Sequence, residues 1–229
     1  MKTAVGAGPA LVALSAIATP ALAQIPVPEP DPKGIEVGAR AGFAHALGDR
    51  VEGQRFDNTV DRAWLLVLDV GYRLTPHLYL GGLLSYARLD VDKGNLGCGT
   101  EFIDGPGDCS GSALRIAAEA QWRWSKRWLA TWIAAGFGAE RFQIDYASGC
   151  MDGPFSQTDT GFEFGHLEIG LGVRPDRGVV VGPFASYSFG MFRNSVFKGS
   201  CRGPPGDDIP DKAIHGMATG GLRVMYTVR

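Results

Sequence analysis

The chain has 229 residues and a formal charge of −2 at pH 7, from 22 lysines and arginines against 24 aspartates and glutamates. This near-neutral balance gives no sign of the basic surface that binds nucleic acid, so we expect no nucleic-acid partner. The 33 glycines are about twice the average share, but they lack the period of three that collagen requires, and the length suits one large β-domain or two small ones.

The first 23 residues have the features of a secretory signal peptide. Lys2 precedes an apolar centre at 11–18, Pro20 interrupts it, and Ala21-Leu22-Ala23 forms a small-x-small cleavage site. A membrane anchor is the alternative, but the apolar run is shorter than the roughly 20 residues that span a bilayer. We therefore expect an exported chain whose mature form begins at Gln24.

A proline-rich lead-in follows at 24–34. Prolines stand at 26, 28, 30 and 32, and their fixed φ angles and missing N–H donors favour an extended polyproline segment outside any sheet. A periplasmic spacer is the favoured interpretation, and a proline-rich ligand is the alternative. We expect residues 35–229 to form one domain.

Eight runs in that domain alternate apolar and polar residues, and a period of two is the pleat of a β-strand. In chain order the runs are 35–47, 62–74, 78–89, 112–124, 128–146, 162–174, 179–192 and 213–228. The fourth shows the pattern best, because its apolar face runs from Leu114 to Trp124 while Arg115, Glu119 and Arg123 lie on the opposite face. We expect each run to be a strand.

Two of the runs depart from the pattern. The run 128–146 begins apolar on both faces, so the alternation does not assign its inner side. Pro183 interrupts the run 179–192, and because proline lacks a ladder donor it indicates a local break or bulge.

The connections between the runs alternate in length. Three are short, at 75–77, 125–127 and 175–178, and four are long and rich in Gly, Pro and Asp, near 48–61, 90–111, 147–161 and 193–212. An even number of strands with short turns at one end and long loops at the other is typical of barrels that cross a membrane. We therefore predict an all-β fold: an eight-stranded antiparallel up-and-down transmembrane β-barrel with short periplasmic turns and long extracellular loops.

The charged faces decide between this fold and a soluble barrel. With the apolar faces inward, the large aromatic side chains would crowd one small cavity, whereas an eight-stranded interior with the polar faces inward lets charges of both signs pair across it. The expected lumen charge network is Glu36, Arg40, Asp69, Arg73, Arg115, Glu119, Arg123, Glu168, Arg174 and Arg223. The expected membrane-interface aromatics are Trp64, Tyr72, Tyr86, Trp122, Trp124, Trp128 and Tyr226.

On these patterns the chain resembles the small eight-stranded outer-membrane β-barrel proteins of Gram-negative bacteria, of the OmpA-barrel, OmpX and OmpW kind. The resemblance covers about 35–228 and includes no catalytic motif. It implies a place in the outer membrane, contact with outer-membrane lipid and insertion by the barrel-assembly machinery. The family usually ends its last strand on an aromatic residue, whereas this chain ends with Tyr226-Thr227-Val228-Arg229.

The four cysteines, Cys98, Cys109, Cys150 and Cys201, all follow the leader. An even number in an exported chain favours disulfides, and no spacing is the close pair of a zinc site. Three connectivities are open; Cys98 with Cys109 and Cys150 with Cys201 is favoured, because the first two share one glycine-rich segment. We expect all four at the outer end, and we expect no metal and no cofactor.

Three functional hypotheses follow. The first is a non-enzymatic barrel, structural or surface-binding through disulfide-held loops, with a plugged or narrow lumen and an unidentified extracellular ligand. The second is an enzyme that modifies outer-membrane lipid, since some similar barrels are lipid A acylases or deacylases; His166 with Glu168, and Ser186 with Ser188 on the next run, are its candidate base and nucleophile. No esterase-type elbow occurs, and a structural role for His166 is favoured. The third is a soluble periplasmic, lipocalin-like carrier.

Overall fold

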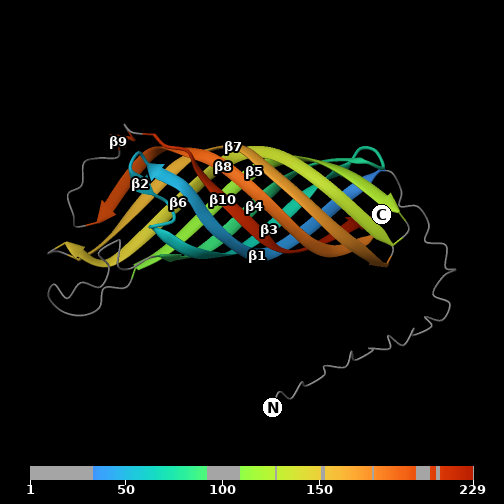
Figure 1. Cartoon of the computed structure of the whole chain (residues 1–229), viewed down its shortest axis with the longest axis horizontal. Helices are drawn as coiled ribbons and strands as arrows, with labels where there is room; N and C mark the ends of the chain where they lie inside the picture. The colour runs from blue at the N-terminus through green and yellow to red at the C-terminus, as the bar shows by residue number, and fades with distance from the viewer. Residues whose placement is uncertain are drawn as a thin grey trace, which may run out of the picture.

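The computed structural model describes residues 33–91, 109–126, 128–150, 153–176, 178–199, 207–209 and 212–228. Their fold confirms the prediction of eight long antiparallel strands in up-and-down order, and the last strand pairs with both its predecessor and the first. This double pairing closes the sheet into a barrel without edges (Figure 1). The predicted signal peptide and most of the proline-rich lead-in lie outside the described residues.

The eight long strands each overlap one predicted run. They are β1 (Gly34–Val51), β3 (Val60–Arg73), β4 (Leu78–Val91), β5 (Cys109–Lys126), β6 (Leu129–Cys150), β7 (Gly153–Asp176), β8 (Val179–Gly199) and β10 (His215–Val228). Two short strands, β2 (Gln54–Arg55) and β9 (Asp207–Asp208), pair with β1 and β8. Both lie at the same end of the barrel, which we call the far end (Figure 1).

Several strands extend further toward the far end than the sequence predicted. β6 and β7 stay paired as far as Cys150 and Gly153, so the prediction of a long loop at 147–161 is wrong. β8 likewise continues to Gly199, well into the predicted loop 193–212. The pairing of Tyr146 with Phe155, whose rings stack with centroids 4.2 Å apart, shows that backbone pairing and ring contacts continue past the alternating segment.

The opposite end, which we call the turn end, carries short connections at 74–77, 127–128 and 177–178. In the first, the Thr75 hydroxyl accepts hydrogen bonds from the backbone N–H groups of His77 and Leu78 at 3.2 and 2.9 Å. Gly178 has a φ of 88°, a value that glycine adopts without strain. Tight turns at this end agree with the prediction.

Irregular pairing occurs along β7 and β8. On both sides of Pro183, β8 keeps the same register with β7, because Gly170 pairs with Phe184 and Val173 pairs with Val181. The predicted break is therefore a gap in pairing without a bulge. A bulge lies instead between Glu163 and Gly165. Because a bulge shifts the alternation by one residue, Glu163 and His166 both point inward.

The two faces of the sheet have opposite character. Outward residues are apolar and exposed, for example Ile116 at 64% and Phe137 at 67%, whereas Arg40 and Glu168 inside are exposed by only 2% and 1%. All seven predicted interface aromatics point outward and are exposed: Trp64, Tyr72, Tyr86, Trp122, Trp124, Trp128 and Tyr226. This is the reverse of a soluble barrel, in which the apolar face forms the core.

Among the described residues, no helix is long and apolar enough to cross a membrane.

Candidate functional site

Five charged residues from five strands meet in the middle of the interior, and we call them the central network: Arg40, Asp69, Glu119, Glu168 and Arg223. Arg40 donates to Glu119 at 2.9 Å, to Asp69 at 3.2 Å and also to Glu168. Arg223 donates to Asp69 and Glu168 at 2.8 Å each. Each arginine thus joins acids from different strands across the lumen.

The central network is held together by hydrogen bonds that leave no carboxylate oxygen free. The Trp132 indole N–H donates to Glu168 at 2.7 Å, and the ring also lies 5.6 Å below the Arg223 guanidinium. Taking such charges out of water costs several kcal/mol per ion unless partners are in place. The network therefore consists of buried groups that depend on one another.

A second group, the turn-end cluster, consists of Glu36, Arg73, Gln121, Arg123 and Thr227. Arg73 and Arg123 both contact the Glu36 carboxylate, and the Thr227 hydroxyl donates to it at 3.0 Å. Arg123 also donates to Gln121 at 2.9 Å through Nε. Here two guanidinium groups surround one carboxylate, so the turn-end cluster carries excess positive charge.

Arg174 lies apart from both groups. Its Nη2 donates to the Ser125 hydroxyl at 2.6 Å, and both side chains lie near the turn end. The other nine residues of the predicted lumen charge network lie inside the barrel, in the two groups above and in a third described next. Arg174 instead lies at the turn-end rim of the barrel.

A third group, the histidine cluster, consists of Arg115, Glu140, Glu163, His166 and His215, and lies on the far side of the central network. Arg115 Nε is 3.2 Å from Glu163, His166 Nδ1 is 3.7 Å from Glu163, and His215 Nε2 is 2.6 Å from Glu140. Several of these buried polar atoms make no hydrogen bond with satisfactory geometry in the described residues.

The sequence reasoning missed three members of the histidine cluster. Glu140 lies on β6, and because the run 128–146 begins apolar on both faces, its alternation did not assign an inner face. The bulge after Glu163 shifts the alternation by one residue, so a strict period of two does not place Glu163 on the same face as His166. His215 falls on the polar face of the last run but had no motif to mark it. Trp132, which donates to Glu168, also lies on β6, and the sequence did not assign it to the inner face for the same reason.

A small cavity adjoins the histidine cluster and is closed toward the far end by phenylalanine rings. The volume open to the centre of a water molecule is about 40 Å³, which is room for roughly three waters. Phe56, Phe142 and Phe192 form an aromatic plug with centroids 5.3 to 6.1 Å apart, and His215 stacks on Phe192 at 4.0 Å. Phe56 enters from the turn between β2 and β3, and its N–H donates to the Gly48 carbonyl at 2.8 Å.

Further ion pairs lie at the far end. Arg50 contacts Asp159 at 2.5 Å, and both are buried beyond the aromatic plug. Arg55 and Asp57 form an exposed pair near β2, joined by a hydrogen bond of 3.0 Å from Nε. That hydrogen bond lowers the pKa of Asp57 and raises the pKa of Arg55.

The predicted catalytic candidates lie together but do not form a nucleophile and base. Ser188 pairs with His166 and Ser186 pairs with Glu168 across β7 and β8. The ring nitrogens of His166 face the carboxylates of Glu119 and Glu163 at 3.6 and 3.7 Å, and Glu168 is already bonded to the central network. His166 is exposed by only 1%, so an acyl chain in the surrounding lipid has no access to it.

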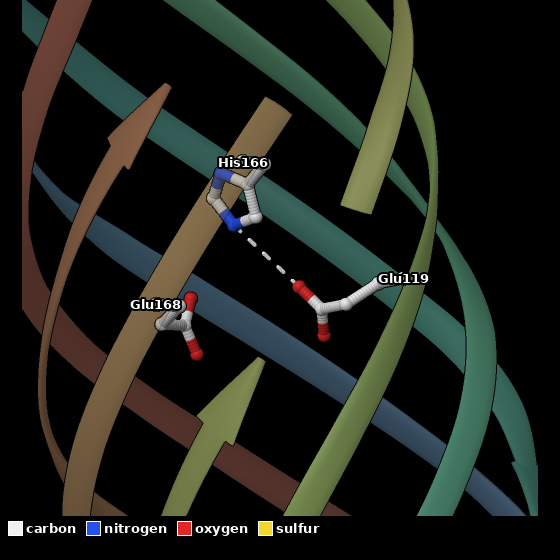
Figure 2. A group of neighbouring side chains, drawn as sticks. All are labelled: Glu119, His166 and Glu168. Atoms are coloured by element: carbon white, nitrogen blue, oxygen red, sulfur yellow. Dashed lines mark ion pairs between the residues drawn. The ribbon is translucent and has the colours of Figure 1, made fainter. Parts of the chain in front are cut away.

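Glu119, His166 and Glu168 offer three donor atoms within 4.8 Å of one another (Figure 2). His166 Nε2 lies 3.6 Å from Glu119, as the dashed line marks. However, all four carboxylate oxygens already accept hydrogen bonds from Arg40, Arg223 or Trp132. A metal ion here would have to displace a guanidinium group, so this trio fits a structural role better.

The cysteines are only partly described. Cys109, the first residue of β5, is in a disulfide. Its pairing with Cys98, and the pairing of Cys150 with Cys201, stay predictions, because Cys98 and Cys201 lie outside the described residues.

The fold and interior together define a closed, eight-stranded barrel with a paired polar lumen and an apolar outer surface. No family model and no curated protein matches the chain. Among solved structures, the chain is similar to neisserial surface protein A, with 16% identity, TM-score 0.46 and coverage of 85% of this chain and 99% of that one.

The chain is also similar to a major outer membrane protein from Thermus thermophilus, with 14% identity, TM-score 0.47 and coverage of 85% of this chain and 99% of that one. A third similar structure is the outer membrane protein OprG from Pseudomonas aeruginosa, with 13% identity, TM-score 0.46 and coverage of 86% of this chain and 98% of that one. Identities this low concern the fold alone. The functional argument below rests on the geometry of this chain.

Proposed function

We propose that the chain is an integral outer-membrane β-barrel without catalytic activity, closed to bulk solutes, whose far end faces outward as a binding surface. The observation that carries the proposal is the inversion of the two faces, apolar outside and charged inside. A closed barrel satisfies all strand backbone groups without water. An inverted barrel of this kind is therefore suited to lipid.

The outer face supports a membrane-spanning band. On β5 every outward side chain from Leu114 to Trp124 is apolar, while Arg115, Glu119 and Arg123 point inward. The same holds on β3 from Trp64 to Tyr72. A charged residue at the lipid-facing midplane would cost about 2–4 kcal/mol, so the absence of charge from these two segments fits a bilayer.

The interior supports a closed lumen. Along the axis from the turn end, the turn-end cluster, the central network and the aromatic plug each contribute buried side chains to the interior. Eight strands leave an interior only wide enough for side chains. The cavity of about 40 Å³ beside the histidine cluster lies between two of these layers.

The proposal is tested by localisation and conductance. The protein should be recovered with outer membranes, and detergent should be needed to extract it. Refolded into planar bilayers, it should remain silent at all voltages. Recovery in the aqueous periplasmic fraction would favour the soluble carrier, and steady large conductance would refute the closed lumen.

The lipid-modifying alternative has less support, because His166, Ser186 and Ser188 face the lumen rather than lipid. Lipid A from strains with wild-type protein, with His166→Ala and without the protein should give the same mass spectrum. A modification lost in both altered strains would restore the enzyme hypothesis.

The proposed partners are outer-membrane lipid and the barrel-assembly machinery. The supporting feature for assembly is the last strand, β10, which presents Leu222, Val224 and Tyr226 outward and pairs with β1 to close the barrel. The same proposal includes secretion by means of the predicted signal peptide, and it includes extracellular loops held by disulfides. An extracellular ligand at the far end is expected but not identified.

A further inference from the structure

The outer surface of the barrel changes from apolar to basic at one level of the wall, toward the far end. On β3, β4 and β6 the series of apolar outward side chains ends at an exposed arginine. The three arginines are Arg62, Arg88 and Arg141. Each lies about a dozen residues from the turn end of its strand, and roughly 9–11 tilted residues cross the hydrocarbon core of a bilayer. The arginines therefore lie at the level where lipid headgroups begin.

Two of these arginines lie on either side of β5. Arg88 of β4 pairs with Ser112 of β5, and Arg141 of β6 pairs with Leu114, the next outward residue of β5 toward the turn end. Neighbouring strands are about 4.8 Å apart and each residue advances about 3.4 Å, so the two arginine Cα atoms are on the order of 12 Å apart. Two extended arginine side chains span that distance, and both guanidinium groups can reach one ligand above Ser112.

Polar neighbours orient Arg141 and place the acids beyond the arginines. Arg141 Nη2 donates to Gln143 Oε1 at 2.8 Å, and Gln143 Nε2 donates to Asp145 at 2.8 Å. This chain of hydrogen bonds uses one of the five N–H groups of the guanidinium. The outward acids of β4 and β6, Asp90 and Asp145, both lie farther toward the far end than Arg88 and Arg141. The outer wall is thus apolar, then basic, then acidic along its length.

On the turn-end side of the two arginines the outer surface is apolar. Tyr86, Leu114 and Ile116 are exposed by 52%, 45% and 64%. Tyr86 and Leu114 also pair with each other across β4 and β5, so their side chains lie next to each other. A ligand that joins an anionic group to acyl chains fits this surface, because the anion meets the arginines while the chains lie on the apolar side chains.

We propose that Arg88 and Arg141 bind a phosphate monoester of an outer-leaflet glycolipid of the lipid A type. Guanidinium groups bind phosphate through paired, charge-assisted hydrogen bonds. The two positive charges match the charge of about −1.5 to −2 on a phosphate monoester at pH 7, whereas a phosphodiester carries a single negative charge. The assignment rests on the proposed function, because it takes the far end to face outward.

The test is lipid binding by the full mature chain, folded in a non-ionic detergent and measured by native mass spectrometry. Lipid A with both phosphates is compared with lipid A from which both phosphates have been removed, and with phosphatidylglycerol, a phosphodiester. We expect the phosphorylated lipid A to bind about tenfold more tightly than either comparison lipid. Arg88→Gln and Arg141→Gln should each lose about tenfold in affinity for it. Folding of each variant is checked by its heat-dependent migration on gels.

The chain supplies a matched control in Arg62. It is an exposed arginine at the same level, but it lies 3.6 Å from Asp61 and pairs in register with Asp90. Arg62→Gln should therefore bind phosphorylated lipid A like the wild type. Equal losses in all three variants would overturn the assignment to Arg88 and Arg141.

The comparison lipids decide the chemistry of the ligand. Equal binding of lipid A with and without its phosphates overturns the proposal, and equally tight binding of phosphatidylglycerol overturns the assignment to a monoester. A barrel that folds in detergent and fails to bind lipid A leaves the proposed function intact, because that function is tested separately by localisation and conductance.

Discussion

The central network and the histidine cluster are neighbouring groups of five ionisable residues inside the barrel, yet their hydrogen bonding differs. In the central network each carboxylate oxygen accepts from an arginine or from Trp132. In the histidine cluster, His215 Nε2 lies 2.6 Å from Glu140 and Arg115 Nε lies 3.2 Å from Glu163, but the two ring nitrogens of His166 are 3.6 and 3.7 Å from their nearest carboxylates. The first group is held by a hydrogen bond on every carboxylate oxygen, whereas the second is held by fewer contacts, of which those of His166 are longer than a hydrogen bond.

The largest expected effect is the loss of an arginine from the central network. Arg223→Met leaves Asp69 and Glu168 without one of their two guanidinium partners, and breaking a buried pair in this way costs about 3–5 kcal/mol. The free energy of unfolding is measured by urea titration in lipid vesicles. Arg62→Met is the control, because Arg62 is exposed and its pair with Asp61 spans 3.6 Å.

If Arg223→Met and Arg62→Met had the same free energy of unfolding, the central network would not stabilise the barrel, and hydrogen bonding would not distinguish its role from that of the histidine cluster.

Removing the centre of the aromatic plug should have the next largest effect. Phe56→Ala deletes a ring that is exposed by only 2%, and such truncations cost about 3–5 kcal/mol. The free energy of unfolding is measured by urea titration in lipid vesicles. Conductance should stay absent, because the central network still closes the middle; a conducting Phe56→Ala would show that the plug alone closes the lumen.

A charge on the outer face tests the membrane assignment. Ile116→Arg places a guanidinium in the middle of the apolar face of β5, where the expected cost is about 2–4 kcal/mol, whereas Trp124→Arg near the turn end should cost roughly 0–1 kcal/mol. Both are measured by urea unfolding in vesicles. Equal costs for the two positions would contradict a bilayer centred on Ile116.

The sequence predicted the central network because a regular period of two assigns each member to the inner face. Arg40 and Arg223 follow this rule, and they also face each other in register across β1 and β10. The histidine cluster could not be predicted, since the bulge at Glu163 breaks the period and β6 is apolar on both faces where Trp132 lies. Beyond the lipid, strand residues need no apolar outer face, so the paired residues that follow Tyr146 were taken for a loop at 147–161.

The smallest expected effect comes from a carboxylate-to-amide change in the histidine cluster, and it separates the two groups most directly. Glu119→Gln puts an amide where Arg40 now finds two oxygens, at 2.9 and 3.1 Å, and loss of hydrogen bonds to a charged group costs about 1.5–3 kcal/mol. Glu163→Gln weakens the contacts with Arg115 at 3.2 Å and His166 at 3.7 Å but relieves the surplus negative charge, so its unfolding free energy should stay within about 1 kcal/mol of the wild type. Both free energies of unfolding are measured by urea titration in vesicles, and a Glu163→Gln variant as destabilised as Glu119→Gln would make the histidine cluster a second structural network.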